Sequence, residues 1–176
     1  MRAMWPAIYS FFTSLPSRIR GERSNGSRLL TRPDGQPGTP SRIPIVALVI
    51  GDGDRQVLTD ISAQELWDVH FAKSCEEACD ATNRLSAPVA VFDRDCPGAE
   101  WRTAVQNLAL SPQRTCVILV SGVADEYLCQ ELIRSGGYDV LAKPLRAGDV
   151  ARVIKLALSY WRVASVPVAQ EPNSWR

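Results

Sequence analysis

The residues VAVFDRDCPG, at positions 89–98, join an uninterrupted apolar run to two carboxylates and a Pro-Gly pair. An apolar run without alternating polar residues is typical of a strand that is buried on both faces, as in a parallel sheet. Asp93 follows the run directly, and Asp95 lies two positions further on. A buried strand that leads straight into acidic residues indicates an α/β sheet with a polar site at the ends of its strands.

Four more apolar runs lie on either side of this one, at 45–50, 69–72, 116–120 and 140–142. Stretches with helical spacing of apolar residues separate the five runs. The clearest of these stretches carries the stripe Val150, Val153, Ile154, Ala157, Leu158 and Trp161. Gly136 and Gly137 stand where the helix before the last run should end. Strict alternation of strands and helices predicts an α/β fold with a doubly wound parallel sheet.

Charge and composition divide the 176 residues into a leader, a domain and a tail. Residues 1–42 hold seven Arg and two acids, a net charge of +5, and the remainder has a net charge of −4. Residues 16–42 are rich in Ser, Arg, Gly and Pro, a composition that cannot bury a core. We therefore predict a basic, disordered leader at 1–42, one domain at 43–162 and a flexible tail at 163–176. The acidic domain lacks the basic patch that nucleic-acid binding requires.

The sequence gives no sign of stable membrane insertion. No apolar run approaches the roughly 20 residues that a membrane helix needs. Residues 1–15 loosely resemble a signal sequence, but Pro6 interrupts them and no small-x-small cleavage site follows, so a weak interfacial anchor is the alternative to a plain leader. The five cysteines are odd in number and contain no CxxC pair, which favours a reducing compartment. These features together predict a cytoplasmic protein.

Polar groups follow four of the five apolar runs. They are Asp52 and Asp54 after the first run, Asp93 and Asp95 after the third, Ser121 after the fourth and Lys143 after the fifth. Because ligands of such sheets bind outside the carboxyl ends of the strands, we expect these groups to share one pocket. Carboxylates hold Mg²⁺ and can act as phosphoryl nucleophiles, while a hydroxyl and an ammonium group can stabilise phosphoryl oxygens. The set predicts phosphoryl-transfer chemistry.

Four segments resemble, in the right order, the receiver domains of bacterial two-component response regulators. VAVFDRDCPG resembles the phosphoacceptor segment, with a Pro-Gly pair four residues after the acceptor Asp. WDVHFAKSCEEA (67–78) resembles the second strand and helix, and CVILVSG (116–122) resembles the fourth strand with its switch hydroxyl. ELIRSGGYDVLAKPL (131–145) resembles the segment that ends in the Lys-Pro turn. The resemblance covers about residues 43–162 and implies a (βα)5, flavodoxin-like sheet with strand order 2-1-3-4-5.

The resemblance also implies a role for each residue. Asp93 is the phosphoacceptor, which a sensor histidine kinase or a phosphotransfer protein phosphorylates. Asp52, Asp93 and Asp95 hold Mg²⁺, the first two by their side chains and Asp95 by its carbonyl group. Ser121 is the switch hydroxyl, Lys143 contacts the phosphate, and a cis peptide bond precedes Pro144. Such a domain is not an enzyme. It signals by protein contacts to a downstream partner that the sequence does not name, since the predicted tail is too short for an output domain.

Departures from the family pattern leave a second interpretation open. The family usually has two adjacent acids after the first strand, and here the first of them is Gly51, for which Asp54 is the candidate substitute. The switch aromatic is replaced by Val140, and Tyr138, on the same face of a strand, is its candidate substitute. Asp95 adds a carboxylate beside the acceptor. The alternative is therefore a degenerate receiver that acts as an interaction module without phosphorylation.

A phosphatase is the third interpretation. The segment ALVIGDGDRQV (47–57) resembles the first motif of haloacid-dehalogenase-type phosphatases, with Asp52 as nucleophile and Asp54 as acid/base. That family needs further acids near a strand end after the lysine, and here only Asp149 and Glu171 follow Lys143. The phosphatase interpretation also leaves the Asp93-x-x-x-Pro97 segment unexplained, so the receiver interpretation is favoured.

Overall fold

Strands and helices alternate strictly in the computed structural model, which describes residues 42–98 and 100–164. The strands are β1 (Ile43–Leu48), β2 (Trp67–Phe71), β3 (Val89–Asp93), β4 (Cys116–Ser121) and β5 (Asp139–Ala142). The helices are α1 (Asp52–Gln64), α2 (Cys75–Leu85), α3 (Trp101–Ala109), α4 (Glu126–Arg134) and α5 (Ala147–Ala164). The strands are parallel in the order β2-β1-β3-β4-β5. The predicted fold class and strand order are thereby confirmed.

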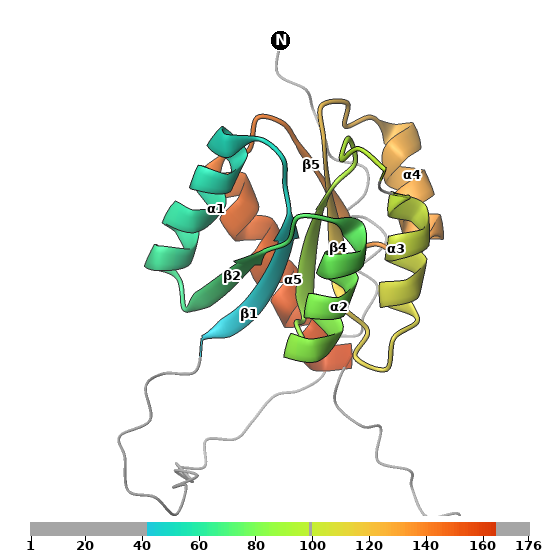
Figure 1. Cartoon of the computed structure of the whole chain (residues 1–176), viewed down its shortest axis with the longest axis horizontal. Helices are drawn as coiled ribbons and strands as arrows, with labels where there is room; N and C mark the ends of the chain where they lie inside the picture. Colours follow the sequence, from blue (N-terminus) through green and yellow to red (C-terminus); the bar gives the residue numbers. More distant parts are fainter. Residues whose placement is uncertain (1–41, 99, 165–176) are drawn as a thin grey trace, which may run out of the picture. The chain divides into compact units, whose positions relative to one another are not determined.

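The sheet separates two hydrophobic cores. Helices α1 and α5 cover one face, and α2, α3 and α4 cover the other (Figure 1). Alternate residues of each strand point into opposite cores, as Ile45 and Val46 of β1 show. Every residue of β3 and β4 is buried. Burial on both faces is the physical reason why these strands are continuous apolar runs in the sequence.

The connection that precedes β5 requires glycine. Gly136 follows α4 with a φ of +90°, in the left-handed region that residues with a side chain rarely adopt. A Cβ atom at this position would also lie 2.7 Å from the Cβ of Ala109, at the end of α3. This agrees with the predicted helix end before the fifth strand.

Two boundaries of the predicted domain can be compared with the structure. The first strand begins at Ile43, where the domain was predicted to begin. Helix α5 continues to Ala164, past the predicted domain end at residue 162. The predicted leader up to residue 41 and the tail from residue 165 onward lie outside the described residues. No helix within the described part is both long and apolar enough to cross a membrane.

Candidate functional site

Asp93 and Lys143 form the centre of the candidate site. Asp93 ends β3 and is 0% exposed, and Lys143 follows β5 directly. The Nζ atom of Lys143 donates to both carboxylate oxygens of Asp93, at 2.6 Å each. The backbone N–H of Lys143 donates to the carbonyl of Ser121 at 2.9 Å, which fixes the start of the loop. The lysine thus crosses the end of β4, the strand between β3 and β5, to reach the acid.

Two backbone N–H groups complete the surroundings of the Asp93 carboxylate. Ile50, just after β1, donates to Oδ2 at 3.3 Å, and Asp95 donates to Oδ1 at 3.1 Å. Each oxygen therefore accepts from Lys143 and from one amide. A buried carboxylate must be paired and hydrogen-bonded to be tolerated, and these four contacts meet that demand. Because β1 and β3 lie side by side where the strand order reverses, this is the edge at which the fold is expected to place a ligand.

Ser121 ends β4 beside Asp93, but its hydroxyl is engaged within its own loop. Its Oγ donates to the carbonyl of Val123 at 2.9 Å and accepts from the N–H of Val123 at 3.1 Å. The register pairs Asp93 with Val120, so Ser121 lies one position further along the neighbouring strand. The hydroxyl would have to leave Val123 to reach a group bound on Asp93.

Asp95 places a second carboxylate at the mouth of the site. Its Oδ2 lies 3.8 Å from Nζ of Lys143, and its side chain is 55% exposed. A Cβ atom on Gly122 would lie 4.0 Å from the same oxygen, so the carboxylate leans over the end of β4. The expectation that Asp95 adds negative charge beside the acceptor therefore agrees with the geometry.

Asp52 lies at the start of α1, two positions after Ile50. Its side chain is exposed, and within the described ranges its carboxylate makes no hydrogen bond or ion pair. Asp54 is occupied elsewhere, because its Oδ1 accepts the backbone N–H of Leu145 at 2.7 Å. Its Oδ2 would lie 3.3 Å from a Cβ atom on Gly51. Asp54 therefore joins the start of α1 to the loop after β5 through one carboxylate oxygen, and its role as a substitute metal ligand stays a prediction.

One contact at the site competes with the predicted Mg²⁺ ion, which would use the side chains of Asp52 and Asp93 and the carbonyl group of Asp95. Within the described residues, no three His, Cys, Asp or Glu side chains are grouped so that they could hold a metal ion. The ammonium group of Lys143 already occupies both oxygens of Asp93, where a cation would have to bind. Asp93 and Asp95, two of the predicted ligands, share a contact with Lys143. The Lys143–Pro144 peptide bond is cis, the geometry that the resemblance implies.

Arg94 is a second cation at the site, and the sequence analysis did not single it out. Its backbone N–H donates to the carbonyl of Val120 at 2.9 Å, which continues the pairing of β3 with β4. Its guanidinium is half-buried and donates from Nη1 to Oγ of Ser121 at 3.5 Å. The available signal was its position, directly after the acceptor.

The thiols of Cys96, near the site, and of Cys79, in α2, are poor nucleophiles. Burial raises the pKa of the Cys96 thiol, the negative charge of Asp93 raises it further, and Lys143 opposes the rise. Burial raises the pKa of Cys79 to about 11, with a smaller contribution from Cys75. All five cysteines are free. Because the thiolate is the reactive form, the site chemistry belongs to the carboxylate of Asp93.

Tyr138 does not stand in for the missing switch aromatic in the way the sequence predicted. It precedes β5 and packs against the core under α1 and α5, with its ring centroid 5.7 Å from that of Tyr160. Val140 lies in the opposite core. The prediction that the two side chains share a face was wrong, because β5 begins at Asp139 and the alternation of a strand does not extend back to Tyr138.

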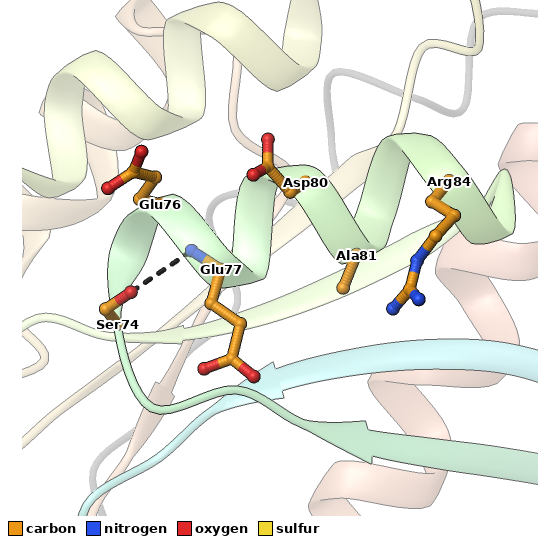
Figure 2. A pocket seen from close by; sticks show the side chains of 6 residues that line it. All are labelled: Ser74, Glu76, Glu77, Asp80, Ala81 and Arg84. Atoms are coloured by element: carbon orange, nitrogen blue, oxygen red, sulfur yellow. Dashed lines mark hydrogen bonds between the residues drawn. The ribbon is translucent and has the colours of Figure 1, made fainter.

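A surface hollow beside α2 contains none of the predicted site residues. Figure 2 shows the side chains that line it, which are Ser74, Glu76, Glu77, Asp80, Ala81 and Arg84. Oγ of Ser74 accepts the N–H of Glu77 at 3.1 Å, and the Glu77 carboxylate accepts the N–H of Lys73 at 2.8 Å. These two bonds cap the N-terminus of α2, which accounts for the positions of Ser74 and Glu77 in the lining.

No protein-family model and no curated protein matches the sequence. The fold is similar to three solved structures, each under 25% identical. The signal receiver domain of an HD domain-containing protein from Pseudomonas fluorescens Pf-5 matches with a TM-score of 0.62 and 20% identity, over 69% of this chain and 98% of that chain. The response regulator from Thermotoga maritima matches with a TM-score of 0.61 and 18% identity, over 67% of this chain and 98% of that chain. The chemotaxis response regulator CheY4 of Vibrio cholerae matches with a TM-score of 0.60 and 16% identity, over 66% of this chain and 98% of that chain. The chain therefore has the fold of response-regulator receiver domains.

Proposed function

We propose that this chain is a cytoplasmic phosphorelay domain that accepts a phosphoryl group on Asp93 from a sensor histidine kinase or a phosphotransfer protein. It is a signalling domain and not an enzyme, and it acts on a downstream protein by contact. The observation that supports this proposal best is the buried carboxylate of Asp93, with Lys143 bound to both oxygens at the edge of a receiver-type sheet.

The proposed reaction is nucleophilic attack of a carboxylate oxygen on phosphorus. The new P–O bond forms on Asp93 while the P–N bond of the donor phosphohistidine breaks, and the imidazole nitrogen keeps the electron pair. Lys143 stabilises the transferred oxygens, and the N–H groups of Ile50 and Asp95 hold the carboxylate in place. The protein contributes mainly position and charge, as phosphoryl transfer requires.

The signal would leave the site through Ser121. If its hydroxyl turns to the phosphoryl group, both bonds with Val123 break and the β4–α4 loop changes shape. This loop leads into α4, whose first turn exposes Tyr127 at 67%, and Val123 itself is 59% exposed. A downstream protein that covers these two side chains would distinguish the two states of the loop.

Labelling with acetyl phosphate tests the proposal. The wild-type chain should gain one phosphoryl group by intact-mass measurement, and Asp93→Asn should gain none. Asp80→Asn is the matched control, because that acid is exposed on α2 and lines the hollow that contains none of the predicted site residues, and it should label like the wild type. Equal labelling of the wild type and Asp93→Asn would contradict the proposal.

A degenerate receiver is the second candidate, and one observation favours it. Gly51 stands where the family pattern has the first of two adjacent acids, and Asp54, the candidate substitute, is bound to the Leu145 amide. The absence of labelling in a folded wild-type chain would favour this candidate. The phosphatase interpretation gains no support, because Asp52 is exposed and the lysine it needs is bound to Asp93.

A further inference from the structure

Resting on the proposed function, we infer that Arg94 takes the place of the divalent cation in this site. Together with Lys143 it binds the phosphoryl group on Asp93, so that phosphorylation proceeds without a metal ion. The inference starts from the ammonium group of Lys143, which already lies on both oxygens of Asp93, where the implied Mg²⁺ ion would bind.

The charges of the site balance without a metal. Two carboxylates, Asp93 and Asp95, face two cations, Lys143 and Arg94. A divalent cation would leave an excess of positive charge and would have to displace the ammonium group that lies 2.6 Å from both oxygens of Asp93. Asp54, the candidate substitute for the missing acid, has one carboxylate oxygen bound to the Leu145 amide.

Arg94 has an unmet capacity to bind an anion. Its guanidinium is half-buried, and in the described part of the chain no carboxylate lies within ion-pair distance of it. Its one side-chain hydrogen bond there is the 3.5 Å contact with Ser121. A guanidinium carries five N–H donors in a planar fork that matches phosphoryl oxygens, so most of these donors remain available.

The backbone places this group at the correct strand end. The N–H of Arg94 is bound to the carbonyl of Val120, which anchors the residue between β3 and β4. Its side chain then reaches Ser121, the hydroxyl proposed to contact the phosphoryl group. Arg94, which follows β3, reaches the end of β4, and Lys143, which follows β5, reaches the end of β3. A group on Asp93 would lie between the two cations.

The reaction adds negative charge that Arg94 can neutralise. The carboxylate of Asp93 carries one negative charge, and the acyl phosphate that replaces it carries close to two. With acetyl phosphate as donor, the new P–O bond forms on Asp93, the P–O bond to acetate breaks, and acetate leaves with the electron pair. Electrostatic donors that meet charge in the transition state typically contribute on the order of 10²–10³ in rate.

The test is labelling of the full chain by acetyl phosphate in excess EDTA and, separately, in Mg²⁺. The wild type should label at the same rate in both buffers. Arg94→Gln should label about tenfold or more slowly in EDTA, and Arg94→Lys should fall between the two, because it keeps the charge but loses the fork. Arg134→Gln is the matched control, since this exposed arginine likewise has one 3.5 Å bond to a neutral side-chain oxygen, that of Gln130. It should label at the wild-type rate.

The outcomes separate this inference from the function on which it rests. Labelling of the wild type in Mg²⁺ but not in EDTA would overturn the inference and leave Asp93 as the acceptor. Equal rates for the wild type and Arg94→Gln, with far-ultraviolet circular dichroism showing both folded, would overturn the role of Arg94. No labelling in either buffer would refute the proposed function, and the inference with it. A shift of the Arg94 Nε–H resonance on labelling, absent in Asp93→Asn, would support direct contact.

Discussion

Replacing Lys143 by Met should destabilise the fold, because Asp93 would keep a buried charge without its cation. Asp93 is 0% exposed, and the ammonium group is its only ionic partner in the described part of the chain. Removing one partner of a buried ion pair typically costs about 3–5 kcal/mol. Two features reduce the cost here. The amides of Ile50 and Asp95 still donate to the carboxylate, and water can enter the space of a side chain that was 22% exposed. We therefore expect a loss of about 3 kcal/mol in the free energy of unfolding, at the lower end of that range.

A double-mutant cycle that combines Lys143→Met with Asp93→Asn identifies the cause of this loss of stability. Asp93→Asn alone should cost little, because Lys143 can turn toward solvent once its partner is neutral. In the double variant, Asp93→Asn should recover about 2 kcal/mol of the loss, since no buried charge remains. The assay is urea unfolding of the four proteins, followed by far-ultraviolet circular dichroism at pH 7. A cost below about 1 kcal/mol for Lys143→Met, or no recovery in the double variant, would refute the reasoning.

Three further changes have defined outcomes. Burial raises the pKa of Asp139 above 3.8, so its charged form is disfavoured in the folded state and its contribution to stability falls as the pH rises through the raised pKa. Asp139→Asn should therefore raise the melting temperature at pH 7 but not at pH 3, and an equal effect at the two pH values would contradict this. Gly136→Ala should lower the free energy of unfolding by about 1–3 kcal/mol in a urea titration, because of its positive φ and its approach to Ala109, and a neutral effect would exclude both causes. Ser74→Ala should cost about 1 kcal/mol in the same titration by removing the cap of α2, whereas Ser74→Asp should cost almost nothing.

The fold was accessible from the sequence because both faces of the central strands are buried. Continuous apolar runs with helical stripes between them specify parallel strands and crossover helices, and the structure confirms each run as a strand. The order of the strands was predicted from the resemblance, because the apolar pattern of a strand does not depend on which strand it pairs with. Asp93 and Lys143 were predicted to meet because both follow strands directly, where position along the chain determines position in space.

The surroundings of several residues depend on details that apolar spacing does not specify. Asp52 was predicted to hold a metal ion; the structure shows it as the first residue of α1 with an exposed side chain, and that role stays a prediction. Asp54 was taken as a substitute ligand, but a tertiary bond to the Leu145 amide, 91 positions away, occupies it. Arg94 was not singled out, because apolar spacing does not say where the side chain of an arginine after a strand lies. Tyr138 was assigned to a face by an alternation that starts only at Asp139.

The bond from Asp54 to Leu145 has a mechanical consequence. It ties the first turn of α1 to the segment that carries Lys143, two stretches that no strand pairing connects directly. If the backbone of this segment moves with the lysine after a group arrives on Asp93, the bond transmits that movement to the first turn of α1. Through this bond, helix α1 is coupled to the loop after β5. A protein bound to α1 alone could therefore sense the state of a site that it never touches.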